Sequence, residues 1–150
     1  MVGLVDRVTE NQAERARMLK VVDPASRYET LTESRTITAD DDGKTFLIGT
    51  DALVVTLPLS TAPGIAGIEV EFVNIGADGN NIITISPAAA DGINGIITLA
   101  ASVVKLSGTV NKDLINTKAS ATTGDSARLM ATPATDWVVK SSTGIWASEA

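Results

Sequence analysis

The run Asp40-Asp41-Asp42-Gly43 is the most concentrated set of possible metal ligands in the sequence. Carboxylate oxygens are hard ligands that suit calcium. The three acids are consecutive, however, and the glutamate that an EF-hand loop places further along is missing. A turn that leads into the next strand is the simpler interpretation of this run. We therefore predict no metal site and no cofactor.

Histidine and cysteine are both absent from the sequence. Their absence excludes a Ser-His-Asp triad, a Cys-His pair and zinc sites built from these ligands. The 18 acidic residues leave carboxylate chemistry open, but a hydrolase of that kind would need two acids that face each other in a cleft. We predict that the protein is not an enzyme.

Two segments, residues 64–67 and 76–79, have a glycine spacing that superficially suggests a phosphate-binding loop. Neither segment has the lysine and hydroxyl residue of a P-loop, and neither opens a helix. Residues 78–80 instead supply side chains that tolerate positive φ between two strand-like runs. Both segments are therefore interpreted as hairpin turns.

The chain of 150 residues has a net charge of −6, and only 3% of its residues are aromatic. Nucleic-acid affinity comes largely from Lys and Arg side chains, so an acidic chain predicts no nucleic-acid partner. The most apolar stretch, residues 92–106, is interrupted by Asn94, Gly95 and Lys105. We therefore expect no signal peptide and no membrane span, and a core that is mainly aliphatic.

Residues 1–33 are predicted to form an N-terminal arm that is partly helical. Residues 5–20 contain good helix formers and no Gly or Pro, and Asp23-Pro24 then ends the helical pattern. The apolar positions of this arm make a thin stripe with polar residues and alanines in the middle, so the segment needs a partner surface. Its candidate partner-binding residues are Leu4, Val5, Val8, Met18 and Leu19.

Residues 34–150 are predicted to form a single all-β body. Alternation is clearest at residues 68–73, where Ile68, Val70 and Phe72 share one face and Glu69 and Glu71 the other. Short strands separated by turn residues, with no helical crossover between them, favour an antiparallel β-sandwich or a barrel-like, jelly-roll-like body. The predicted strands are residues 36–38, 44–48, 53–57, 68–74, 81–86, 93–99, 103–107, 113–118, 127–131, 136–140 and 144–147.

The order of several short motifs resembles a β domain of tailed-bacteriophage virion proteins, found in head decoration (cement) proteins and in some fibre components. The resemblance covers about residues 36–147. The motifs that carry it are residues 43–48 (GKTFLI), 55–58 (VTLP), 67–74 (GIEVEFVN), 83–87 (ITISP), 91–95 (DGING), 115–119 (INTKA), 124–125 (GD), 136–139 (DWVV) and 144–146 (GIW).

The resemblance implies a structural protein on the outer surface of a phage capsid, made in the cytoplasm of the host bacterium. Such a protein is commonly a homotrimer, and it stabilises the lattice by bridging neighbouring major capsid proteins. The arm would then be a capsid or intersubunit contact. The alternative is a fibre, tail or knob component that binds a host glycan or receptor, for which an exposed aromatic pocket near Trp137 or Trp146 would be the sign.

Overall fold

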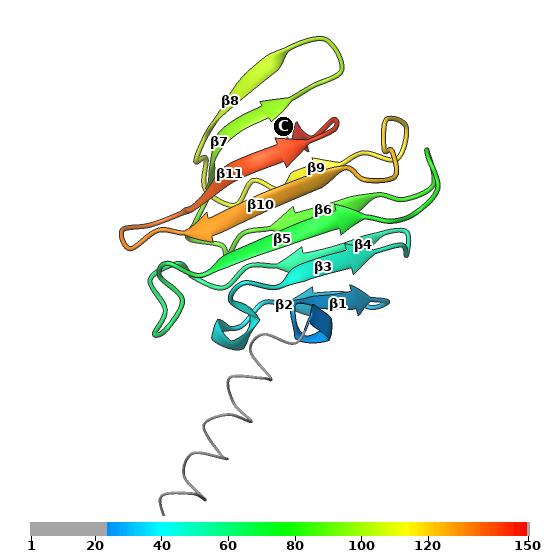
Figure 1. Ribbon diagram of the computed structural model, residues 1–150. Coiled ribbons are helices and arrows are strands. Elements are labelled where there is room, and N and C mark those ends of the chain that lie inside the picture. The colour runs from blue at the N-terminus through cyan, green and yellow to red at the C-terminus, as the bar shows by residue number, and fades with distance from the viewer. Residues whose placement is uncertain (1–23, 150) are drawn as a thin grey trace, which may run out of the picture.

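The structure of the chain is a computed structural model that describes residues 24–149. Twelve strands in this part of the chain form two sheets, and two short 3-10 helices, η1 (Pro24–Ser26) and η2 (Ala39–Asp41), lie beside the first strands (Figure 1). The prediction of an all-β body is confirmed. The helix predicted over residues 5–20 lies outside the described residues. No helix among residues 24–149 is long and apolar enough to cross a membrane.

The larger sheet has seven strands and the smaller sheet has five. Across the larger sheet the order is β1 (Tyr28–Leu31), β3 (Thr45–Ile48), β5 (Glu69–Asn74), β10 (Ser126–Ala131), β11 (Trp137–Thr143), β7 (Ile93–Thr98) and β8 (Val103–Ser107). Across the smaller sheet it is β12 (Ala147–Ser148), β9 (Leu114–Asn116), β6 (Ile83–Ser86), β4 (Leu53–Thr56) and β2 (Arg35–Thr36).

The prediction of antiparallel pairing is wrong for half of the strand pairs. From β1 to β6 the chain changes sheet after every strand, so β1, β3 and β5 are parallel neighbours in one sheet and β2, β4 and β6 in the other. A parallel pair needs a long crossover, which is usually a helix. Here the crossover from β1 to β3 runs through β2 in the opposite sheet, so the lack of helices did not require antiparallel strands.

The first strand was missed from sequence. Residues 28–31, within the predicted arm, form β1, which pairs with β3 along its whole length. The other eleven strands overlap the predicted runs, and β8 coincides with its run at both ends. The short β1 carries only one buried residue, Leu31, so the alternation that marks a strand is weak there.

One hydrophobic core lies between the two sheets and contains residues from both. It is mainly aliphatic, as predicted, with four fully buried aromatic residues, Phe46, Phe72, Trp137 and Trp146. The rings of Phe46 and Phe72 stack at 5.6 Å on neighbouring strands β3 and β5. In β5, Val70 and Phe72 are buried and the two glutamates are not, which confirms the predicted alternation.

Buried amides connect the two sheets at the end of β5. The Asn74 side chain donates to the Asn116 Oδ1 atom at 2.8 Å, and Asn116 in turn donates to Asp125 at 2.8 Å and to the Ile145 carbonyl at 3.0 Å. Asn81 donates to the Asn74 Oδ1 atom at 3.1 Å. Because Asn74 ends a strand of the larger sheet and Asn116 ends a strand of the smaller one, this amide network fixes the position of one sheet against the other.

Candidate interaction surface

The body has two different ends, each made by one edge strand from each sheet. Strands β1 and β2 form one end, and strands β8 and β12 form the other (Figure 1). Edge strands can pair with another chain, and natural proteins cover or block them when such pairing is unwanted. Whether the edge strands at each end are covered or exposed therefore indicates where a partner could bind.

The end at β1 and β2 is closed by four charged side chains, Glu29, Arg35, Asp41 and Lys44, which we call the ion-pair cluster. Arg35 pairs with Glu29 and, at 2.6 Å, with the fully buried Asp41. Lys44 lies 3.0 Å from the same Asp41 carboxylate. The guanidinium of Arg35 also lies 5.2 Å from the centre of the Phe46 ring, so the cluster covers the end of the core.

The consecutive acids at residues 40–42 thus belong to a turn, as the simpler interpretation predicted. Asp41 ends η2, and its carboxylate accepts a hydrogen bond from the Thr38 backbone N–H at 2.9 Å. Asp42 accepts from the Glu69 backbone N–H at 2.9 Å. Within residues 24–149 no group of three or more acidic side chains is placed to hold a metal ion.

The ion-pair cluster lowers the pKa of both of its carboxyl groups. The hydrogen bond from Arg35 is the main cause of the lowered pKa of Glu29. Burial alone would raise the pKa of Asp41, but the Thr38 N–H, Lys44 and Arg35 together outweigh burial and leave that pKa below its ordinary value. A general acid for sugar hydrolysis needs a raised pKa, so this pair of acids is not suited to that role.

Stability in acid should depend on Asp41. A carboxyl group whose pKa is lower in the folded chain stabilises the fold above its ordinary pKa of 3.8, and this contribution is lost as the pH falls through the lower folded value. At pH 7, Asp41→Asn should reduce the free energy of unfolding by about 2 kcal/mol, because Arg35 and Lys44 lose their buried partner. Denaturant unfolding at pH 7 and pH 3 measures this difference, which should shrink at the lower pH.

Asp40→Asn is the matched control for this prediction, because Asp40 is an exposed neighbour of the same chemistry. It should change the free energy of unfolding by less than about 0.5 kcal/mol. Equal losses for Asp40→Asn and Asp41→Asn would show that the ion-pair cluster does not stabilise this end of the body.

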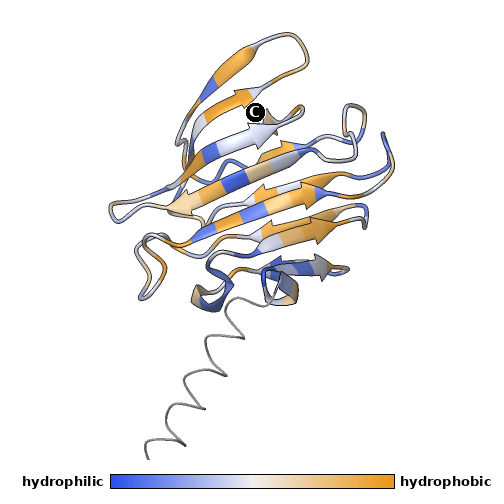
Figure 2. Ribbon diagram, in the orientation of Figure 1, coloured by the Kyte–Doolittle hydropathy of each residue, from blue (hydrophilic) through white to orange (hydrophobic). Residues whose placement is uncertain are grey.

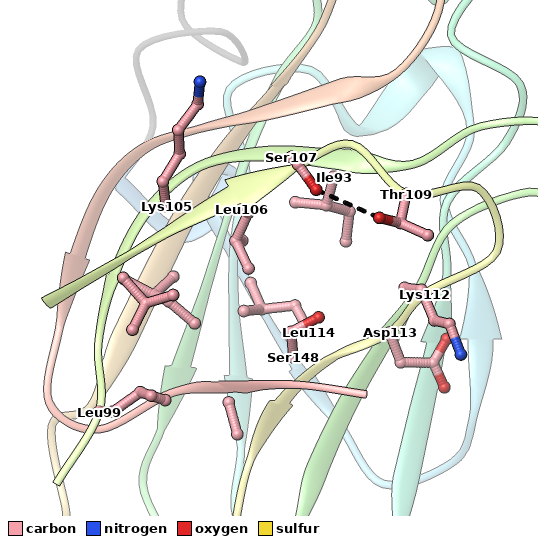
Figure 3. Close-up of a pocket in the computed structure, with 13 residues that line it drawn as sticks. Ile93, Leu99, Lys105, Leu106, Ser107, Thr109, Lys112, Asp113, Leu114 and Ser148 are labelled. Atoms are coloured by element: carbon pink, nitrogen blue, oxygen red, sulfur yellow. Dashed lines mark hydrogen bonds between the residues drawn. The ribbon is translucent and has the colours of Figure 1, made fainter. Parts of the chain in front are cut away.

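The other end of the body is open. Between β8 and β12 lies a groove of about 370 Å³. Its apolar lining comes from β7, β8, β9 and β12 together with Leu99. Figure 3 shows Leu106 and Leu114 at the middle of this groove, with Lys105, Lys112 and Asp113 around its rim.

The outer face of the β7–β8 hairpin carries two exposed apolar side chains among polar ones. Ile96 and Val103 lie on the same outward face of the two paired strands and are 63% and 69% exposed. Figure 2 shows hydrophobic and hydrophilic residues mixed along both strands of the hairpin. The hairpin therefore presents apolar side chains to the groove on one face, and to solvent a mixed face on which Ile96 and Val103 lie among Thr98, Lys105 and Ser107.

The residues predicted to bind a partner, Leu4, Val5, Val8, Met18 and Leu19, lie outside the described residues. The groove was not predicted, because its lining combines three consecutive strands, β7, β8 and β9, with β12, which is distant from them in sequence. Leu106 and Leu114 belong to strands that the sequence did predict. The exposed Ile96 and Val103 of β7 and β8 were a usable signal, since a strand face that is in contact with solvent usually carries polar residues at such positions.

Comparison with known proteins identifies no relative, because no family model, curated protein or solved structure matches the chain.

Proposed function

We propose that this chain is a structural virion protein that binds the outer surface of a phage capsid and stabilises the lattice by bridging neighbouring major capsid proteins. The resemblance of residues 36–147 to the β domain of phage decoration proteins supports this function. In this proposal the body is sandwich-like or jelly-roll-like, and the partly helical N-terminal arm makes the capsid or intersubunit contact.

The observation that carries the proposal is the position of the two ends of the body. The described chain begins at Pro24 beside β1, at one edge of the larger sheet, and the groove opens beside β8 at the opposite edge. Six steps between adjacent strands of about 4.8 Å each separate these edges by about 29 Å. A bridging protein needs two such separate contact regions, and bridging requires no catalytic residue.

The body is also suited to transmitting mechanical force between its two ends. The ion-pair cluster closes one end, and the amide network joins the sheets in between. Satisfied buried polar networks fix a single arrangement of the groups around them. A protein that binds only the assembled lattice stabilises it by mass action, so a rigid body with two contact regions is enough for this function.

The alternative function, a fibre or knob component that binds a glycan or receptor, has less support. Both tryptophans that would form its aromatic pocket are fully buried. The Trp137 Nε1–H group donates to the Pro58 carbonyl at 2.9 Å, and that of Trp146 donates to the Thr143 carbonyl at 3.0 Å. Neither ring is available as a platform on which a sugar could stack.

The arm can be tested by changing its apolar residues in the full chain. Replacing Leu4, Val5 and Val8 together by serine should weaken co-sedimentation with capsids by about tenfold or more, because burial of each side chain contributes about 1.5 kcal/mol or more. Substitution is preferred to deletion of residues 1–30, which would remove most of β1.

The matched control replaces three polar residues of the same segment, Thr9, Asn11 and Gln12, by serine. This control variant should sediment with capsids as the unmodified chain does. Undiminished binding by the variant that lacks the three apolar side chains would contradict the role given to the arm.

A further inference from the structure

Strand β8 is the longest edge strand in the described part of the chain, and it lies at the outer edge of the larger sheet (Figure 1). It has five residues, against four in β1 and two each in β2 and β12. It contains no proline or glycine, and it pairs with β7 through five residue pairs without a bulge. Short strands, prolines and bulges are common means of keeping an edge from pairing, and β8 has none of them.

Three residues of β8 direct their backbone groups away from the sheet. In an antiparallel pair, hydrogen-bonded residue pairs alternate with pairs that are not hydrogen-bonded. The Leu99 N–H donates to the Ser102 carbonyl at 2.8 Å, so the alternation makes Val104 and Leu106 the residues of β8 that bond to β7. The backbone groups that point outward, with no partner among residues 24–149, are those of Val103, Lys105 and Ser107.

The middle residue of this edge, Lys105, pairs with no acidic side chain among residues 24–149. Figure 3 shows its side chain pointing away from Leu106, on the exposed face of β8. The basic residues of the described chain that do form ion pairs are Arg35, Lys44, Lys118, Arg128 and Lys140. Lys105 is therefore available to an acidic residue of a partner.

We propose that β8 binds an extended segment of a different protein as an additional strand, with an aspartate or glutamate of that segment opposite Lys105. In β-strand addition, backbone hydrogen bonds provide affinity and alternate side chains provide specificity. The outward N–H and C=O groups of β8 supply the hydrogen bonds, and Lys105 selects the acid. The inference goes beyond the capsid contact of the proposed function and does not depend on it.

A second copy of this chain fits this edge poorly. Full overlap of two antiparallel β8 strands would place Lys105 opposite the same lysine of the other copy, and like charges directly opposite each other are destabilising. The edge strand β1 contains Glu29, but Glu29 lies beside the buried Phe46 on the core face of the sheet. On the outer face, Lys105 would lie opposite Tyr28 or Thr30. Because neither pairing places an acid opposite Lys105, the partner is a different protein.

Amide hydrogen exchange in the presence of synthetic peptides tests the inference on the full chain. Two acetylated and amidated peptides, Thr-Val-Glu-Val-Thr and Thr-Val-Lys-Val-Thr, are added separately, and exchange is followed residue by residue by NMR. Saturation with the glutamate peptide should slow exchange about tenfold or more at Val103, Lys105 and Ser107. Val104 and Leu106 already bond to β7 and should change little. The lysine peptide should bind about fivefold more weakly.

Lys105→Glu should reverse this preference, so that the lysine peptide binds more tightly. Lys118→Glu is the matched control, because it changes the net charge equally at an exposed position outside β8 and should leave the preference for the glutamate peptide unchanged. Absence of protection with both peptides, or an unreversed preference in Lys105→Glu, would overturn the inference. Concentration-dependent protection of the three amides in the chain alone would also overturn it, since a second copy would then occupy β8. None of these outcomes bears on capsid binding, which co-sedimentation measures separately.

Discussion

Replacing Gly144 by alanine should cost about 3 kcal/mol of stability and lower the melting temperature by about 10 °C. Gly144 has a φ of +86°, which alanine adopts only with strain. A Cβ atom there would also lie 1.9 Å from the Oδ1 atom of Asp125. The buried Asp125 carboxylate would have to move, and it would then lose its hydrogen bonds from Asn116 and from the Thr122 N–H.

Gly124→Ala separates the two causes of this loss. Gly124 also has a left-handed backbone, with φ of +97°, but nothing lies within 4 Å of the Cβ atom that alanine would add. Only backbone strain should therefore act in this variant, at a cost of about 1 kcal/mol. Thermal unfolding of both variants by circular dichroism measures the difference. Equal losses of stability in the two variants would contradict the view that displacement of the Asp125 carboxylate adds to the cost at Gly144.

The second large effect is expected for Asn116→Leu, at about 3 kcal/mol. Leucine has a similar size but cannot replace the hydrogen bonds of Asn116 with Asn74, Asp125 and the Ile145 carbonyl. Each buried polar group left without a partner costs about 1–3 kcal/mol. Because Asn116 connects the two sheets, the variant should also weaken the coupling between them, which would appear as faster amide hydrogen exchange in β9 and β6.

Ser141→Leu is the control for this prediction, because Ser141 is exposed on β11 and lies outside the amide network. Its stability should change by less than about 0.5 kcal/mol. Denaturant unfolding compares the two variants at one pH. An Asn116→Leu variant as stable as the control would show that the amide network does not hold the sheets together.

The strands were predictable because their residues alternate or cluster within a few positions. The pattern at residues 68–73 places Val70 and Phe72 inside without reference to the rest of the chain. The direction of pairing was not predictable in this way, since it depends on the path that the chain takes between sheets. The sequence of residues 32–44 does not show that β2 joins the opposite sheet. It also does not show that β3 then pairs with β1 in parallel.

The candidate interaction surface was likewise predictable only in part. That Asp41 belongs to a turn could be predicted from the three consecutive acids, but its partner Arg35 lies on β2 and meets it only through the fold. The groove depends on β8 and β12 forming the edges of two sheets at the same end of the body. Hydrophobicity identifies Leu106 and Leu114 as buried strand residues, and only the topology places them beside an open hollow.

The dissociation temperature of the capsid, measured as this chain is added, tests the central claim most directly. If a neighbouring reading frame encodes a major capsid protein, the capsids would be assembled from that protein, and the same chain would be offered to its dissociated subunits. Binding to the assembled lattice alone should raise the dissociation temperature until the sites are filled, with a stabilisation of about 2.7 kcal/mol per site at a free concentration 100 times the Kd. An unchanged dissociation temperature, or equal binding to dissociated subunits, would contradict the account.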